Sequence, residues 1–475
     1  MENKLSYSKL TAIIVGSTVG AGIYTTTGDM AASGAHTGSI IIGWIICGIG
    51  MLGIMMSFYG LNKVRPDLTD GIYSYAREQF GEYVGFSSAW GYWFSSLMAN
   101  VSYFVLLFSA IGYFFPVFGG GNNLVSIICA SILLWLVNWL VLRGITQAAA
   151  VNLVTTICKL IPIFVFIIAV IFTLNFKPSI FIQNFWGNGD ISLIDQIRST
   201  NSGTVWSFLG IEGIVVISAR AKKKSDIGKA AMTGFVGILI IYVLVAMLSL
   251  GTMPIEDMAK LQSPQLAGIL EVVIGPFGAT LVNIGLIISL LGSLLSWTII
   301  SVECPSEAAN QGAFMKIFAR KNKHGSPVFS LFLTNGIIQF FLITILINES
   351  TYQAVYTMGI TMIMFPYAFS AIYYAKLCFT KQGFENSSIK ERTASSIFAI
   401  LGVIYSFWML YCSSYALLLP AAVIYAAGII VYVLGRKEKN AKIFDKKYEM
   451  YIAVAVVIIA VIAIVMMIQG KITLL

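Results

Sequence analysis

The sequence predicts an all-α polytopic membrane protein with about thirteen transmembrane helices. Of its 475 residues, 58% are hydrophobic and only 11% are charged, whereas soluble domains carry about 25% charged residues. Apolar runs of about 20 residues, each long enough to span a bilayer as a helix, recur along the whole chain. Two of these runs are interrupted by glycines, which is the pattern of a transporter built from two inverted repeats.

The first interruption contains Gly16, Gly20 and Gly22, within GSTVGAGI. Each glycine weakens a helix by about 1 kcal/mol relative to alanine. In hydrocarbon, a broken backbone survives only where it is buried in protein or lines a watery cavity. A half-helix beginning there would direct free N–H groups and the positive end of its dipole at the gap, a suitable position for a carboxylate. The alternative is close packing of an unbroken helix, because Gly16 and Gly20 are four residues apart.

The second interruption lies in WSFLGIEG, where Gly210 and Gly213 bracket Glu212. Paired interruptions at corresponding positions of two halves point to an inverted repeat with a substrate site near the membrane midplane. The pairing favours a broken helix over the packing alternative at the first interruption. We therefore expect the first repeat, helices 1–5, and the start of the second, helix 6, in residues 1–230. The rest of the second repeat, helices 7–10, is expected in 231–380, and accessory helices 11–13 are expected in 381–475.

The apolar runs place the helices in order along the chain. A short turn at 36–38 separates the first two, Pro116 ends the third, and 175–202 is expected to be the longest outer segment. The polar segment 62–82 is expected on the inner side, with an amphipathic stretch at 67–75. The expected helices are 10–33, 39–61, 84–115, 124–142, 148–174, 203 onward, 230–251, 268–302, 327–347, 353–378, 394–412, 415–434 and 451–468.

The positive charge indicates the orientation. Most of the 30 Lys and Arg residues fall in alternate loops, which the positive-inside rule assigns to the cytoplasm. This puts the N-terminus in the cytoplasm and, after an odd number of spans, the C-terminus outside. Nucleic-acid binding is not expected, because the basic residues are divided among short loops. The exceptions are Lys177, Arg198, Lys260 and Lys471 in outer loops and Lys159 within a membrane segment.

The six cysteines and two histidines suggest no chemistry of their own. The cysteines lie in or beside apolar runs, and their spacing fits neither a metal site nor a disulfide framework. The histidines and cysteines form no catalytic constellation. We therefore expect no cofactor, no metal and no enzyme activity.

Four stretches resemble the amino acid–polyamine–organocation superfamily, and its basic amino acid/polyamine antiporters in particular. They are GSTVGAGIY in helix 1, YWFSSLMAN in helix 3, WSFLGIE in helix 6 and GSLLSWT in helix 8. The resemblance extends over roughly residues 8–435. It implies the leucine-transporter fold with a 5+5 inverted repeat, and exchange of an amino acid for a related amino acid or its decarboxylated amine.

The resemblance also implies positions for the substrate. The backbone of Gly20, Ala21 and Gly22 would hold its carboxylate, and the side chain of Trp206 would close over it. The set is completed by carbonyls for the α-ammonium at Val19, Trp206 and Leu209, by Ser95, Ser96 and Asn100 at the distal end of the side chain, by Trp297 at its flank, and by Thr357 or Thr361 from helix 10. Serines 95 and 96 depart from the small apolar residues that other members often carry. The alternative to these pocket roles is that Trp206 and Trp297 belong to the aromatic belt at the membrane interface.

Two charged residues lie within predicted membrane spans, where a charge costs several kcal/mol and marks function by default. For Glu212 we expect a proton-sensitive role beside the site; the alternative is a carboxylate bonded only by the unwound backbone of its own helix. For Lys159, the resemblance implies a position near the first break, where its ammonium would replace the sodium of sodium-coupled relatives. The alternative is a lysine that extends to the membrane surface. No role is assigned to Asp29 or His36.

The sequence thus predicts a plasma-membrane (inner-membrane) exchanger of amino acids, cationic ones above all, working by alternating access. Expected pairs are arginine with ornithine or histidine with histamine. A proton-coupled symporter is the alternative in the same class, and an amino acid sensor that binds without transport is the alternative in another. The expected partners are the small-molecule substrates and the lipid bilayer.

Overall fold

The computed structural model describes residues 18–68, 71–144, 148–213, 224–385 and 387–474, together with Tyr7, Leu10, Thr11 and Val15. Gly16 of the first predicted interruption and residues 220–223 of the basic inner loop lie outside this set. Apart from an isolated bridge between Lys321 and Pro327, the regular structure of the described residues is helical.

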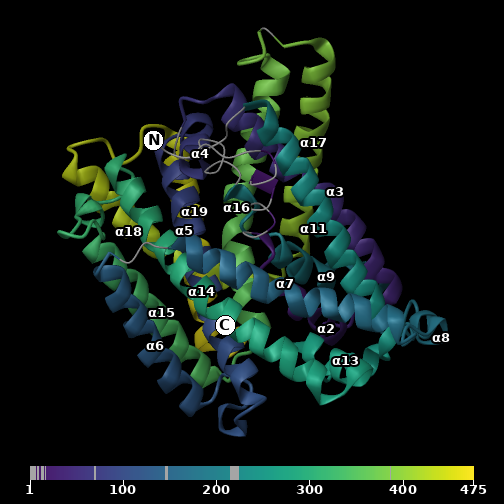
Figure 1. Ribbon diagram of the computed structural model, residues 1–475. Coiled ribbons are helices and arrows are strands. Elements are labelled where there is room, and N and C mark those ends of the chain that lie inside the picture. The colour runs from purple at the N-terminus through teal and green to yellow at the C-terminus, as the bar shows by residue number, and fades with distance from the viewer. Residues whose placement is uncertain are drawn as a thin grey trace.

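The elements follow one another as a string of helices (Figure 1). In the first half they are η1 (Gly22–Tyr24), α2 (Thr26–Ala32), α3 (Thr37–Val64), α4 (Ile72–Phe80), α5 (Glu82–Gly112), η2 (Pro116–Phe118), α6 (Leu124–Leu142), α7 (Ala148–Phe172), α8 (Pro178–Ile182), α9 (Leu193–Ser207) and η3 (Ile211–Gly213). In the second half they are α11 (Lys224–Thr252), α12 (Ile255–Met258), α13 (Gln265–Ile274), α14 (Pro276–Asn310), η4 (Lys316–Ala319), α15 (Val328–Asn348), α16 (Tyr352–Thr380), α17 (Ile389–Cys412), α18 (Tyr415–Glu438) and α19 (Lys447–Ile468).

Within the described residues, 10 helices are long and apolar enough to cross a membrane. The remaining predicted spans correspond to α7, whose described apolar part is Ile157–Phe172, and to the two interrupted segments around α2 and α9. The protein is therefore a multi-pass, all-helical membrane protein, as its composition predicts.

Besides shifts of a few residues at helix ends, two predictions of secondary structure are wrong. The segment 193–202, expected in an outer loop, is the first part of α9; the hydroxyl of Ser192 accepts the Asp195 N–H at 3.2 Å and caps the helix. The run 268–302, expected as one helix, is divided between α13 and α14 at Gly275, whose φ of +72° is followed by a proline. Hydropathy misses both features, because polar residues can continue a helix and one Gly–Pro pair scarcely lowers an apolar average. The amphipathic inner segment is also displaced, to α4.

The helix α5 forms the centre of the molecule. Its most apolar stretch is 94% buried, and it packs against α4, α14 and α16. Around this centre, α6 lies beside α15 and α3 lies beside α17 (Figure 1). Only 17% of the most apolar stretch of α19 is buried, as expected for a helix whose other neighbour is lipid. We call the face that carries α8 and α13 the outer face, following the charge distribution, and the opposite face, with α4, the inner face.

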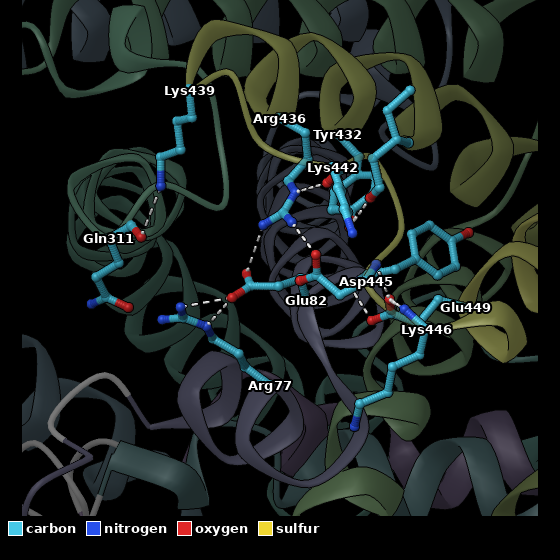
Figure 2. Close-up of polar contacts among 12 residues, drawn as sticks. Arg77, Glu82, Gln311, Tyr432, Arg436, Lys439, Lys442, Asp445, Lys446 and Glu449 are labelled. Carbon is cyan, nitrogen blue, oxygen red and sulfur yellow. Dashed lines mark hydrogen bonds and ion pairs between the residues drawn. The ribbon is translucent and has the colours of Figure 1, made fainter.

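An ion-pair network joins three helices at the inner face (Figure 2). Arg436 of α18 contacts Asp445 at 2.8 Å and Glu82 of α5 at 3.8 Å. Glu82 is also bonded by Arg77 of α4 at 2.7 Å. Networks of several charges contribute more than isolated surface pairs. The network therefore holds α4 and the segment before α19 against the central helix.

Glu449 attaches the start of α19 to the same region (Figure 2). Its carboxylate is fully buried and accepts the backbone N–H groups of Tyr83, Asp445 and Lys446 at 3.2, 3.0 and 3.1 Å. Gly81 lies against it, with φ of +93°, and a Cβ there would lie 2.3 Å from a carboxylate oxygen of Glu449. Both the backbone conformation and this close approach require glycine.

Candidate functional site

The first helix is broken after Thr18. The N–H of Val19 still reaches the Val15 carbonyl at 2.9 Å, but Gly20 and Ala21 are not helical, and η1 begins at Gly22. Within the described residues, the N–H groups of Gly22 and Ile23 have no hydrogen-bond acceptor. Such unpaired donors at the start of a half-helix form a position for an anion.

The second break follows α9. The chain leaves the helix after Ser207 and turns through Gly210, whose φ of +100° favours glycine, before η3 begins at Ile211. The carbonyl of Trp206 still accepts the Leu209 N–H, at 3.3 Å. The glycine identified in the sequence thus lies at the position where the helix is interrupted.

The two breaks touch. A Cβ on Gly22 would lie 3.0 Å from Cδ1 of Trp206 and 3.1 Å from Oγ of Ser207. From α11, the hydroxyl of Tyr242 lies 2.8 Å from the Ser207 carbonyl oxygen and 3.2 Å from the Thr18 carbonyl oxygen, so its proton can be donated to either. Tyr242 cannot be recognised from the sequence as part of the site, because a single tyrosine in an apolar run gives no sign of what it will reach.

An aromatic cluster surrounds the junction on its outer side. The ring of Trp206 stacks on that of Tyr356, with centroids 5.0 Å apart and planes at 17°, and its Nε1 donates to the Tyr352 hydroxyl at 2.7 Å. Tyr103 of α5 lies 5.9 Å from the Trp206 ring and 6.4 Å from the Trp297 ring. The two tryptophans singled out in the sequence therefore belong to one cluster, joined through Tyr103.

The polar residues of α5 differ in how they are bonded. Ser95 is buried, and its hydroxyl has no partner among the described residues. Ser96 donates to the Trp93 carbonyl at 2.6 Å. The Asn100 amide donates to Ser301 of α14 at 3.1 Å, so it joins two helices. Ser95 is thus the member of this group whose hydroxyl is available to a ligand.

The two threonines of α16 bond to their own helix. Thr357 donates to the Gln353 carbonyl at 2.7 Å, and Thr361 donates to the Thr357 carbonyl at 3.0 Å. Thr357 also lines an open cavity of about 500 Å³ on the outer side of the site. We call this the outer cavity; its lining includes Ser33, Asp195, Arg198, Gln353, Thr357 and Leu417.

Glu212 connects the second break to two other helices. Its buried carboxylate accepts the hydroxyls of Tyr92 from α5 at 3.1 Å and Tyr367 from α16 at 2.6 Å, together with the Gly210 N–H at 3.1 Å. The alternative of a purely local role is therefore too narrow, since one bond is local and two are distant. The Glu212 carboxylate thus joins the second break to α5 and α16.

Lys159 lies in α7 beside the first break. It is 5% exposed, and its backbone carbonyl accepts a hydrogen bond from the hydroxyl of Tyr24 in η1. The position implied by the resemblance, near the helix 1 break, agrees with this contact between the lysine backbone and η1.

Asp29 in α2 is a second buried carboxylate, to which the sequence analysis assigned no role. It is 3% exposed and accepts hydrogen bonds from Nε2 of Gln265 at 2.9 Å and from the Tyr356 hydroxyl at 3.0 Å. Among the described residues, no lysine, arginine or histidine pairs with it. An acidic residue near the predicted end of helix 1 was visible in the sequence, but its partners were not.

A comparison with protein families matches residues 5–411 to the amino acid permease model. The chain belongs to the amino acid permease family. An arginine/ornithine antiporter of Pseudomonas aeruginosa is 42% identical over 99% of this chain and 98% of its own length. Arginine/agmatine antiporters of Chlamydia felis and Chlamydia pneumoniae are 41% and 39% identical, over 96% and 98% of this chain and 95% and 96% of their own lengths. Family membership confirms the predicted superfamily and the fold class.

Proposed function

We propose that this permease exchanges a cationic amino acid for its metabolic product, an amino acid or an amine, by alternating access. The observation that carries the proposal is the meeting of two broken helices at Gly22 and Ser207, with unpaired N–H groups of the first break beside backbone carbonyls of the second. One junction thereby offers donors for a carboxylate and acceptors for an ammonium. The similarity to antiporters named for arginine, ornithine and agmatine supports a cationic substrate.

In this proposal, the backbone N–H groups of Gly20, Ala21 and Gly22 bind the α-carboxylate. The carbonyls of Val19 and Leu209 accept hydrogen bonds from the α-ammonium; that of Trp206, already bonded to the Leu209 N–H, has a second lone pair for the same purpose. The ring of Trp206 covers the substrate and favours a cation over its face by about 1–2 kcal/mol when water is excluded.

The distal end of the substrate side chain lies along α5 in this arrangement. Ser95, with its unpartnered hydroxyl, is the best-supported contact, and Trp297 flanks it across Tyr103. Ser96, Asn100, Thr357 and Thr361 are already bonded to protein. They contribute through their remaining lone pairs or by shaping the pocket.

Glu212 and Lys159 are proposed to couple substrate binding to conformation. The Glu212 carboxylate accepts the Gly210 N–H at 3.1 Å within the second break, and in this proposal a cationic substrate and a proton weaken each other's binding by the same factor. Lys159, beside η1, is proposed to supply the positive charge that sodium supplies in other transporters. Exchange would then need no sodium gradient.

The proposed setting is the plasma membrane, with the N-terminus in the cytoplasm and the C-terminus outside. Repeat boundaries near residues 230 and 380 belong to the same proposal. A protease-cleavable tag placed after Leu475 checks the orientation. External protease should remove the tag from intact cells, and protection of the tag would count against an outer C-terminus.

Counterflow in proteoliposomes tests the function. Uptake of labelled arginine should require arginine, ornithine or agmatine inside the vesicles, and unlabelled cationic amino acids and amines should compete with it. Uptake driven by a proton gradient into empty vesicles would indicate a symporter instead. Binding without any uptake would indicate a sensor.

A further inference from the structure

Asp29 joins three elements on the outer side of the junction. It lies in α2, the half-helix that begins at the first break, and its carboxylate is bonded by Gln265 of α13 and Tyr356 of α16. Tyr356 in turn stacks on Trp206. Any movement that separates α2 from α13 and α16, and so opens the junction toward the outer face, must break these bonds.

The outer cavity lies near the backbone of Asp29 and the end of α2. Nε2 of Gln353 donates to the Asp29 backbone carbonyl at 3.2 Å and to the Ser33 hydroxyl at 2.7 Å. Both Gln353 and Ser33 line the outer cavity. One side chain, that of Gln353, thus separates the Asp29 backbone from the outer cavity.

Asp29 differs from the carboxylate at the outer cavity in having no cationic partner among the described residues. The other carboxylate at the cavity, Asp195, is paired with Arg198 at 3.0 Å. The Asp29 carboxylate is hydrogen-bonded by neutral groups, Thr25, Gln265 and Tyr356, and has no cationic partner within the described part of the chain. A buried carboxylate held only by neutral groups is costly, and losing those donors raises the cost unless water or a cation replaces them.

We propose that Asp29 is a second, outer binding position for the cationic end of the substrate, occupied while the path to the outer face is open. When α2 moves away from Gln265 and Tyr356, the carboxylate faces the outer cavity and binds the guanidinium or ammonium of an entering substrate. Closure returns Asp29 to its protein donors and releases the cation toward Trp206. A cation therefore stabilises the outward-open state and a neutral amino acid does not. This inference rests on the proposed exchange of cationic amino acids.

The test uses proteoliposomes in which protease access to a terminal tag defines the orientation. With arginine inside, KM is measured for external arginine and for external citrulline, an analogue of arginine whose side chain is uncharged. KM is then measured for internal arginine. Asp29→Asn should raise the external KM for arginine by about tenfold, the equivalent of about 1.4 kcal/mol. The external KM for citrulline, the internal KM for arginine and kcat should each change by less than about twofold.

Three further variants separate charge from structure. Glu256→Gln removes a negative charge from an exposed outer position, where Glu256 is bonded by Asn184, and should leave the external KM unchanged. Tyr356→Phe removes one donor and keeps the carboxylate, so the preference for arginine over citrulline should persist. Gln265→Met, which weakens the closed arrangement, should lower the external KM for arginine.

Equal losses for arginine and citrulline, or equal losses on both faces, would assign Asp29 a structural role and overturn the inference. If Asp29→Asn cannot be purified folded, Gln265→Met decides: an external KM that is unchanged or raised also overturns it. The absence of exchange in the unaltered protein would refute the proposed function instead, so the two failures are distinguishable.

Discussion

Replacing Gly22 with alanine tests whether the two breaks must touch. The added Cβ would lie 3.0 Å from Cδ1 of Trp206, 3.1 Å from Oγ of Ser207 and 3.3 Å from Cα of Ser207. These neighbours have little room to move, because the Trp206 ring is stacked on Tyr356 and bonded to Tyr352. Overpacking of this kind costs about 1–3 kcal/mol, which corresponds to an affinity loss of about 5-fold to about 150-fold.

The assay is equilibrium binding of labelled arginine to the purified protein, with the thermal midpoint measured in parallel. Gly22→Ala should weaken binding by the stated factor, and Gly22→Leu should abolish it. Gly237→Ala in α11 is the control, since a Cβ there would meet nothing within 4 Å; its affinity should be unchanged. Normal affinity in Gly22→Leu would refute the assignment of the first break as the carboxylate position.

Three further predictions concern buried charges. Lys159→Ala should abolish transport while largely preserving the fold, and sodium-stimulated uptake by the unaltered protein would contradict the role assigned to this lysine. Exchange should fall at low pH, because protonation of Glu212 removes a charge that favours a cationic substrate. Glu212→Gln should flatten the dependence of exchange rate on pH; if the two proteins have the same pH dependence, Glu212 is only a structural cap. Glu449→Ala should lower the thermal midpoint in detergent, because three backbone N–H groups lose their acceptor. Each buried group left unpaired lowers the stability by about 1–3 kcal/mol. An unchanged midpoint would show that water replaces the carboxylate.

The sequence predicts the structure best where the deciding property is local. The apolar run at 124–142 coincides with α6, and the run at 327–347 differs from α15 by one residue at each end. The glycine at 210 marks the second break because its φ of +100° is a conformation that other residues rarely adopt. Hydropathy over a helix length and glycine's backbone freedom are both readable from neighbouring residues alone.

The sequence predicts the structure poorly where a helix boundary depends on capping or on a single turn. The polar residues of 193–202 continue α9, and the boundary between α13 and α14 falls at Gly275 inside an otherwise apolar run. Averaged hydropathy treats the first as loop and the second as helix. In both places the local hydrogen bonds and turn geometry outweigh the average.

By itself, the sequence determined that the chain spans a membrane many times, that two of its helices are broken, and that Gly20, Gly22 and Gly210 lie at the breaks. Only the tertiary structure decided what surrounds them. Tyr242 reaches the end of α9 from 35 residues away, and the Asp29 carboxylate is bonded by Tyr356, 327 residues along the chain. The physical reason is that hydropathy and backbone freedom belong to short stretches of chain, whereas the partner of a buried polar group is set by which distant helices pack together.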